Sequence, residues 1–83
     1  MTGDIIPRMN WQNYIEWKPD VALGKPVFKG TRLTVEFILE RLGEGAEVDD
    51  LVANYIGLSI DHIRAATAYA AAVLRQDELV HTT

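Results

Sequence analysis

The sequence predicts a mostly helical protein: a three-helix, homeodomain-like helix-turn-helix bundle preceded by short N-terminal β-strands. Two short runs of bulky, strand-prone residues lie near the amino terminus, at 14–17 and 26–28. Three stretches with helical spacing of apolar residues follow them. The last two are joined by about four residues, 56–59, which is the connection length of a helix-turn-helix unit.

The length of 83 residues fits one domain. We place an amino-terminal arm at 1–13, the helix-turn-helix domain with its strands at 14–76, and a carboxyl-terminal tail at 77–83. The arm shows no clear periodicity, so we expect it to be loosely held.

Proline and glycine limit both predicted strands. Lys18-Pro19-Asp20 breaks the first strand, and Gly30 ends the second. Because proline has no N–H to donate to a neighbouring strand, Pro26 confines the second strand to a sheet edge or to its own first position.

Capping residues and glycines mark the helix ends. Thr34 can accept from the free N–H groups of a first turn, so it is predicted to cap a helix that Gly43 and Gly45 end. A second helix opens with acidic residues, which favour an N-terminal turn, and it ends before Gly57. The apolar faces of these two helices comprise Val35, Ile38, Leu39 and Leu42, then Val48, Leu51, Val52 and Tyr55.

The third predicted helix, capped by Ser59 and running over 60–76, is apolar on two sides. One side is expected to pack against the other helices: Ile60, Ile63, Thr67, Ala70, Ala71 and Leu74. The other side is the predicted partner interface: Ala65, Ala66, Tyr69, Ala72 and Val73. A monomer's surface helix normally has a broad polar face, which this helix lacks. The alternative is that the N-terminal strands cover the second side.

The composition limits the ways in which so short a chain can gain additional stability. A domain of this size buries only about 60% of its unfolded surface, so disulfides, a metal or a partner often help. The chain has no cysteine, which excludes disulfides and thiolate ligands, and two histidines alone argue against structural zinc. We therefore expect no metal or cofactor, and a homodimer is the remaining supplement.

The hydropathy of the sequence indicates in which cellular compartment the protein is expected. No apolar run approaches the roughly 20 residues of a membrane span. Asp4 beside Ile5 and Ile6 is not typical of a secretory signal. The expectation is a cytoplasmic protein without membrane association.

A locally basic segment at 18–32 lies in a protein of net charge −4. Nucleic-acid-binding proteins are usually basic, so a phosphate contact would have to come from this segment, just ahead of a helix amino terminus. The predicted DNA-contacting residues are Lys25, Lys29, Gly30, Thr31 and Arg32, with Arg64 of the third helix as the strong reader of guanine. The alternative is a tight turn in which Arg32 pairs with a local acid such as Glu36.

Nothing in the sequence indicates an enzyme. His62 is adjacent to Asp61, but neighbouring helix residues do not face each other, so they cannot form a base and its orienting carboxylate. We find no nucleophile with a plausible base, and a catalytic site needs converging groups.

The run Gly24-Lys25-Pro26-Val27-Phe28-Lys29-Gly30-Thr31-Arg32-Leu33, followed by Val35, resembles the signature of the bacterial domain of unknown function 433 family. Leu51, Tyr55 and Leu58, and the stretch 65–70, are also similar to that family, and the resemblance covers roughly 13–73. Two positions depart from the family pattern. Ile56 stands where the family usually has proline, and Leu23 stands where it often has a further glycine.

The resemblance implies a small helix-turn-helix domain, often dimeric, that serves as the antitoxin of a type II toxin–antitoxin pair beside a PIN-like toxin. Such an antitoxin would bind its toxin and its own operator DNA. The acidic net charge and the apolar second side of the third helix leave an alternative open. In that alternative the chain is a protein-interaction module that dimerises or binds a partner without contacting DNA.

Overall fold

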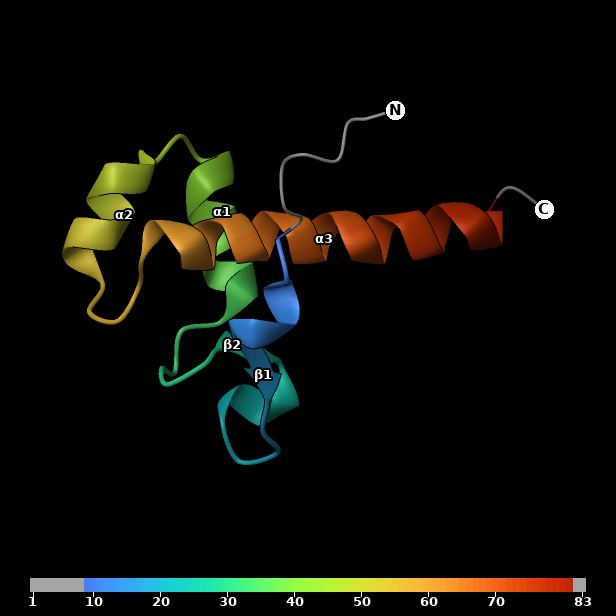
Figure 1. Ribbon diagram of the computed structural model, residues 1–83, viewed down its shortest axis with the longest axis horizontal. Helices are drawn as coiled ribbons and strands as arrows, with labels where there is room; N and C mark the ends of the chain where they lie inside the picture. Colours follow the sequence, from blue (N-terminus) through green and yellow to red (C-terminus); the bar gives the residue numbers. More distant parts are fainter. Residues whose placement is uncertain (1–8, 82–83) are drawn as a thin grey trace.

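The computed structural model describes residues 9–81, with side chains through residue 76. Most of the predicted arm, at 1–8, and the last two residues of the predicted tail lie outside the described residues. The elements in chain order are η2 (Trp11–Asn13), β1 (Ile15–Trp17), η3 (Ala22–Gly24), β2 (Pro26–Phe28), α1 (Val35–Gly43), α2 (Val48–Asn54) and α3 (Ile60–His81) (Figure 1). The predicted fold class, three helices preceded by short strands, is confirmed.

The two strands form a small antiparallel sheet. Ile15 lies opposite Phe28, and Trp17 lies opposite Pro26. Pro26 is the first residue of its strand, as its missing N–H requires. Ile15 and Trp17 lie on the same face of β1; Ile15 is buried in the core, and Trp17, at the other end of the strand, is half exposed.

The helices begin close to the predicted positions, and α1 ends at Gly43 as predicted. The Thr34 side chain accepts from the Phe37 N–H at 3.0 Å, so it caps α1 as predicted. The third helix continues to His81, past its predicted end at Gln76. No helix within residues 9–81 is both long and apolar enough to cross a membrane.

The core lies where both strands, α1 and the first half of α3 meet. Phe28, Ile38, Val27 and Val35 are its largest fully buried side chains. Each such side chain contributes about 1.5–3 kcal/mol of hydrophobic stabilisation. In Figure 1, α1, α2 and the strands gather around the amino-terminal half of α3, and the other half extends beyond them. The fold therefore leaves the distal part of its longest helix without a neighbouring element in the described chain.

Part of the predicted arm belongs to the fold. Residues 11–13 form the short helix η2, and it packs on α3. Trp11 meets Tyr69 edge-on at 5.0 Å between ring centroids and Trp17 at 6.2 Å. Large aromatic rings bury much apolar area in such pairs, which fixes this segment against the helix. The prediction of a loose arm is thus wrong for these residues.

Candidate functional site

The loop after β2 contains most of the predicted DNA contacts, but two of them are engaged within the fold. The Thr31 hydroxyl donates to the Phe28 carbonyl at 2.8 Å and accepts from the Leu33 N–H at 3.0 Å. The Gly30 N–H points at Glu16 Oε2, 3.4 Å away. The prediction that Gly30 and Thr31 offer free donors to a phosphate is therefore corrected: they close a tight turn.

Lys25 is also engaged. Its Nζ lies 3.1 Å from Glu36 Oε1, and both side chains are more than half exposed. This contact corrects the alternative in which Arg32 pairs with Glu36. An exposed pair of this kind contributes about 0–1 kcal/mol and can be rearranged by a ligand.

The other three predicted cations remain accessible. Lys29, Arg32 and Arg64 are exposed, and none of the ion pairs found within residues 9–76 involves them. The loop that carries Lys29 and Arg32 touches the turn between α2 and α3. A Cβ placed on Gly57 would lie 3.2 Å from the Thr31 methyl carbon. The fold thus brings the basic loop against the helix-turn-helix turn.

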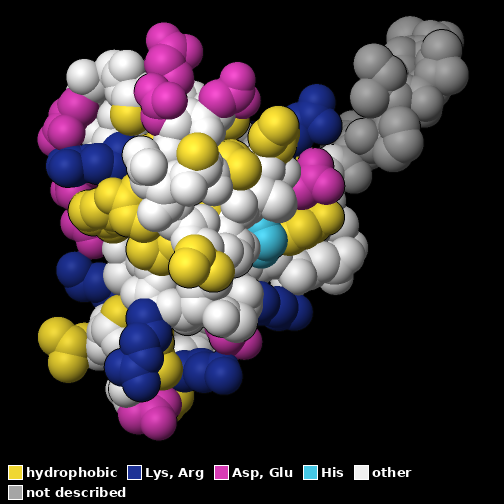
Figure 2. Space-filling view, turned by 90° about the vertical axis from the view of Figure 1, so that its left-hand side faces the viewer, with side chains coloured by type: hydrophobic (Ala, Val, Ile, Leu, Met, Phe, Trp, Pro, Cys, Tyr) yellow, Lys and Arg dark blue, Asp and Glu magenta, His cyan; other side chains and the backbone are white. Residues whose placement is uncertain are grey.

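Charge is unevenly spread over the face that contains this turn. Figure 2 shows acidic side chains gathered at the top of that face and most Lys and Arg side chains lower down. The sequence explains this division, because α2 opens with Asp49 and Asp50 while the basic segment forms the strand region. A polyanion on this face would meet attraction and repulsion within one surface.

The predicted partner interface on α3 is largely internal. Ala65 and Ala66 have no exposed surface, so the prediction that these two contact a partner is wrong. Tyr69 is half-buried between Trp11 and Trp17, with its ring centroid 5.8 Å from the latter. The N-terminal segment covers this side, as the alternative in the sequence analysis held. Ala72 is half-buried and Val73 is 39% exposed, and a partner contact by them stays a prediction.

The side of α3 expected to face the other helices is turned toward solvent instead. Ile63 is buried and Ala70 half-buried, but Ile60 and Leu74 are 52% and 61% exposed. Thr67 and Ala71 are also exposed. Apolar residues lie on both sides of this alanine-rich helix. Their helical spacing is compatible with either side facing the core, so spacing alone could not identify the buried side. The bulk of Tyr69 is the signal that distinguishes the buried side.

The His62 side chain packs within the fold. Its Nδ1 accepts from the Ser59 N–H at 3.1 Å and lies 2.7 Å from the Ser59 hydroxyl. Its ring meets Tyr14 at 5.3 Å and Phe28 at 5.7 Å, both edge-on. Desolvation by these neighbours lowers the pKa of His62, and the charge of Asp61 opposes that effect. A histidine held neutral in this way serves as a structural residue.

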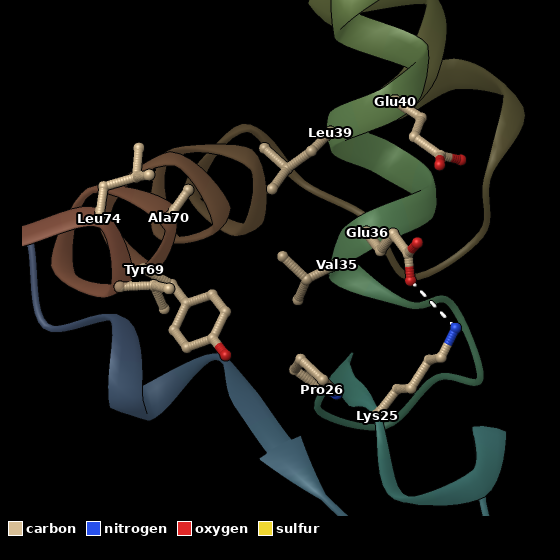
Figure 3. Close-up of a pocket in the computed structure, with 10 residues that line it drawn as sticks. Lys25, Pro26, Val35, Glu36, Leu39, Glu40, Tyr69, Ala70 and Leu74 are labelled. Atoms are coloured by element: carbon tan, nitrogen blue, oxygen red, sulfur yellow. Dashed lines mark hydrogen bonds and ion pairs between the residues drawn. The ribbon is translucent and has the colours of Figure 1, made fainter. Parts of the chain in front are cut away.

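Sequence reasoning missed an apolar groove between α1 and α3, of about 590 Å³. Figure 3 shows Val35 and Leu39 extending from α1 toward α3, with Pro26 at the lower end. The α3 wall is formed by Tyr69, Ala70, Val73 and Leu74, and Lys25, Glu36 and Glu40 complete the lining. Leu39 and Leu74 were assigned to the buried sides of their helices, so no residue pattern indicated that a gap would remain between them.

Comparison with known proteins gives a family and one solved relative. The model of the family "Protein of unknown function (DUF433)" matches residues 15–70. A crystal structure of a DUF433 member protein from Anabaena variabilis ATCC 29413 superposes with a TM-score of 0.71 and 29% sequence identity. The match covers 87% of this chain and 71% of the other. No curated protein matches. With the family model matching well over half of its residues, the chain belongs to the DUF433 family of proteins of unknown function.

Proposed function

We propose that this protein is a protein-interaction module that acts as the antitoxin of a type II toxin–antitoxin pair and binds a PIN-like toxin. The apolar groove between α1 and α3 carries the proposal, because Leu74 on its edge exposes 61% of its surface. An apolar depression with a charged rim is typical of a protein-binding surface. The antitoxin role rests on what the resemblance to the family implies.

Charge favours a protein partner over DNA as the principal ligand. The net charge is −4, and the acidic start of α2 lies on the same face as the basic loop. DNA binding draws most of its affinity from neutralised phosphates, which an acidic protein supplies poorly.

Co-expression tests the antitoxin role. The full chain should co-purify with a tagged PIN-like nuclease encoded beside it, and it should relieve the growth arrest that the nuclease causes. The measurements are the stoichiometry of the purified complex and nuclease activity with increasing amounts of this protein. Failure to co-purify, together with undiminished nuclease activity at excess protein, would defeat the proposal.

Operator binding is a second candidate, favoured by the contact between the basic loop and the helix-turn-helix turn. Lys29 and Arg32 are exposed on this loop, and Arg64 is exposed near the start of α3. Phosphate contacts by these cations would make binding fall steeply with salt.

Gel-shift titration against the upstream DNA tests this candidate, with and without the toxin. The double variant Lys29→Glu with Arg32→Glu should abolish the shift. Lys18→Glu with Arg75→Glu is the charge-matched control, because both side chains are exposed and neither belongs to the loop after β2 or to the predicted DNA contacts. Absence of any shift at low salt would leave the protein-binding role alone.

A further inference from the structure

The loop that joins β1 to β2, residues 18–25 and here called the η3 loop, has an unusual backbone. Ala22, Leu23 and Gly24 follow one another with φ angles of +51°, +59° and +80°, all in the left-handed region. Glycine adopts this region freely, but a residue with a side chain brings its Cβ too close to the following carbonyl oxygen. Strained residues of this kind cluster at sites that bind other molecules.

Backbone hydrogen bonds hold the η3 loop in this conformation. The Val21 N–H donates to the Lys18 carbonyl at 3.1 Å. The Gly24 N–H donates to the Val21 carbonyl at 3.0 Å, and the Lys25 N–H donates to the Ala22 carbonyl at 3.1 Å. The last pair of the two-stranded sheet closes the base of the loop. The side chains of this loop are therefore presented in fixed directions.

The strained conformation turns the Leu23 side chain into solvent, where 93% of it is exposed. Val21 and Ala22 are half-buried, so Leu23 is the large aliphatic side chain that the η3 loop exposes. Figure 1 shows the loop at the lower end of the molecule, away from α3. A leucine with backbone strain and almost no buried surface adds nothing to the core, so its side chain is available to a partner.

We propose that the η3 loop is a contact surface separate from the groove, and that Leu23 inserts into an apolar pocket with a carboxylate-bearing rim on a protein partner. The exposed Lys18 and Lys25 indicate the charge of that rim. They lie at the two ends of the loop, with 55% and 56% of their side chains exposed, and Asp20 is the one acid between them. Figure 2 shows most Lys and Arg side chains toward this lower end of the molecule.

Both lysines can turn to a partner at little cost. Lys18 Nζ lies 3.6 Å from Glu16 Oε2, and Lys25 Nζ lies 3.1 Å from Glu36 Oε1. Ion pairs at the protein surface contribute little to stability, so carboxylates across an interface can replace these partners.

A pocket on a protein suits this loop better than a lipid surface. A loop that is already ordered loses little conformational freedom on binding, so one fixed side chain can add affinity. Attachment to a membrane instead requires a broad apolar face beside the cations. The η3 loop offers the single aliphatic side chain of Leu23.

The inference rests on the proposed function for its partner, so the probe is the purified PIN-like nuclease encoded beside this protein. Isothermal titration should show that Leu23→Gly and Leu23→Asn each weaken binding by about ten- to a hundredfold, the contribution of one buried leucine side chain. Glycine and asparagine both tolerate the left-handed region, so urea unfolding should find both variants at least as stable as wild type. Affinity that falls while stability does not cannot result from misfolding.

Two further variants serve as controls. Leu23→Met keeps an apolar side chain of similar volume and should retain most of the affinity. Ile56→Asn should leave the affinity unchanged, because Ile56 is 99% exposed on the turn between α2 and α3, outside both the loop and the groove. If Ile56→Asn weakens binding as much as Leu23→Asn does, the special role of Leu23 is overturned.

Salt dependence tests the charge of the rim. Lys18→Gln with Lys25→Gln should weaken binding by about threefold to tenfold and flatten its dependence on salt between about 50 mM and about 500 mM. Lys29→Gln with Arg32→Gln removes the same charge from the exposed loop after β2 and is the matched control. An equal loss in both double variants would show that net charge acts, not the two lysines of the η3 loop.

The outcomes separate this inference from the proposed function. A nuclease that binds wild type and Leu23→Gly equally overturns the inference and leaves the antitoxin role standing. If Leu74→Arg abolishes binding in that case, the groove alone contacts the partner. A nuclease that does not bind wild type defeats the antitoxin role and the inference with it. Binding of wild type, but not Leu23→Gly, to phosphatidylserine vesicles would assign the loop to a lipid surface and also overturn the inference.

Discussion

Ser59 and His62 cap each other at the amino terminus of α3. The Ser59 hydroxyl accepts from the His62 N–H at 3.3 Å, and His62 Nδ1 accepts from the Ser59 N–H at 3.1 Å. This is the reciprocal capping box, with histidine in the place that Glu or Gln usually takes. Because a backbone N–H can only donate, Nδ1 must be unprotonated for the box to form.

Protonation of His62 should therefore open the box and destabilise the fold. Burial lowers the pKa of His62 below its ordinary value of 6.5, so the unfolded chain binds the proton more readily than the folded chain. The stabilisation is fully present above pH 6.5 and is lost as the pH falls through the lowered pKa. Urea unfolding between about pH 7.5 and about pH 5 should show a midpoint that falls with pH.

His62→Gln is the matched control, since glutamine can complete the same box without titrating in this range. The variant should keep most of the stability at neutral pH and lose the dependence between pH 6.5 and the lowered pKa. Ser59→Ala should instead cost about 1 kcal/mol, because it removes the cap oxygen. If wild type and His62→Gln lose stability in parallel on acidification, carboxylate titration and not His62 causes the fall.

The sequence was sufficient for the two strands and the starts of the three α-helices, but not for η2 or for how α3 is rotated. Thr34, Pro26 and Ser59 set element boundaries through local chemistry, and local chemistry can be recognised without tertiary contacts. The buried side of α3 depends on where Trp11 packs, which is a long-range choice. For the same reason, the hydrogen bonds that engage Thr31 could not be predicted from its position in a basic segment.

Gly57 is predicted to tolerate no side chain. Its φ of +91° is strained for any L residue, and an added Cβ would lie 3.2 Å from the Thr31 methyl carbon. Gly57→Ala should lower the free energy of unfolding by about 1–2 kcal/mol. Thr31→Ser removes the methyl group and keeps the hydroxyl, so Gly57→Ala should cost less in that background. An equal cost in both backgrounds in a double-mutant cycle would show that backbone strain acts alone.

The loop at η3 contains backbone strain that a substitution can relieve. Leu23 has φ +59° and ψ +31°, a left-handed conformation that costs a residue with a side chain about 1 kcal/mol or more, and its side chain is 93% exposed. Relief of this strain is partly offset by the roughly 0.5–1 kcal/mol of extra backbone entropy that glycine loses on folding, so Leu23→Gly should raise the free energy of unfolding by about 0.5 kcal/mol. Val21→Gly is the contrasting change: Val21 has an ordinary extended φ of −121°, so glycine there should destabilise. Urea titration of both variants measures the two changes in the free energy of unfolding. A destabilised Leu23→Gly would mean that Leu23 stabilises the isolated chain through its side chain.

Trp11 covers part of the predicted partner interface on α3, and substitution of Trp11 by a smaller residue would expose it. Trp11→Ala deletes the edge-on contacts with Tyr69 and Trp17 and exposes the side of α3 that carries Ala72. We expect a loss of about 3 kcal/mol in the free energy of unfolding, at the lower end for a buried tryptophan because Trp11 is only partly buried. Trp11→Phe should restore roughly half of it, since an aromatic ring can still meet Tyr69. A loss below about 0.5 kcal/mol would place Trp11 among ordinary surface residues and return this side of α3 to the candidates for a partner interface.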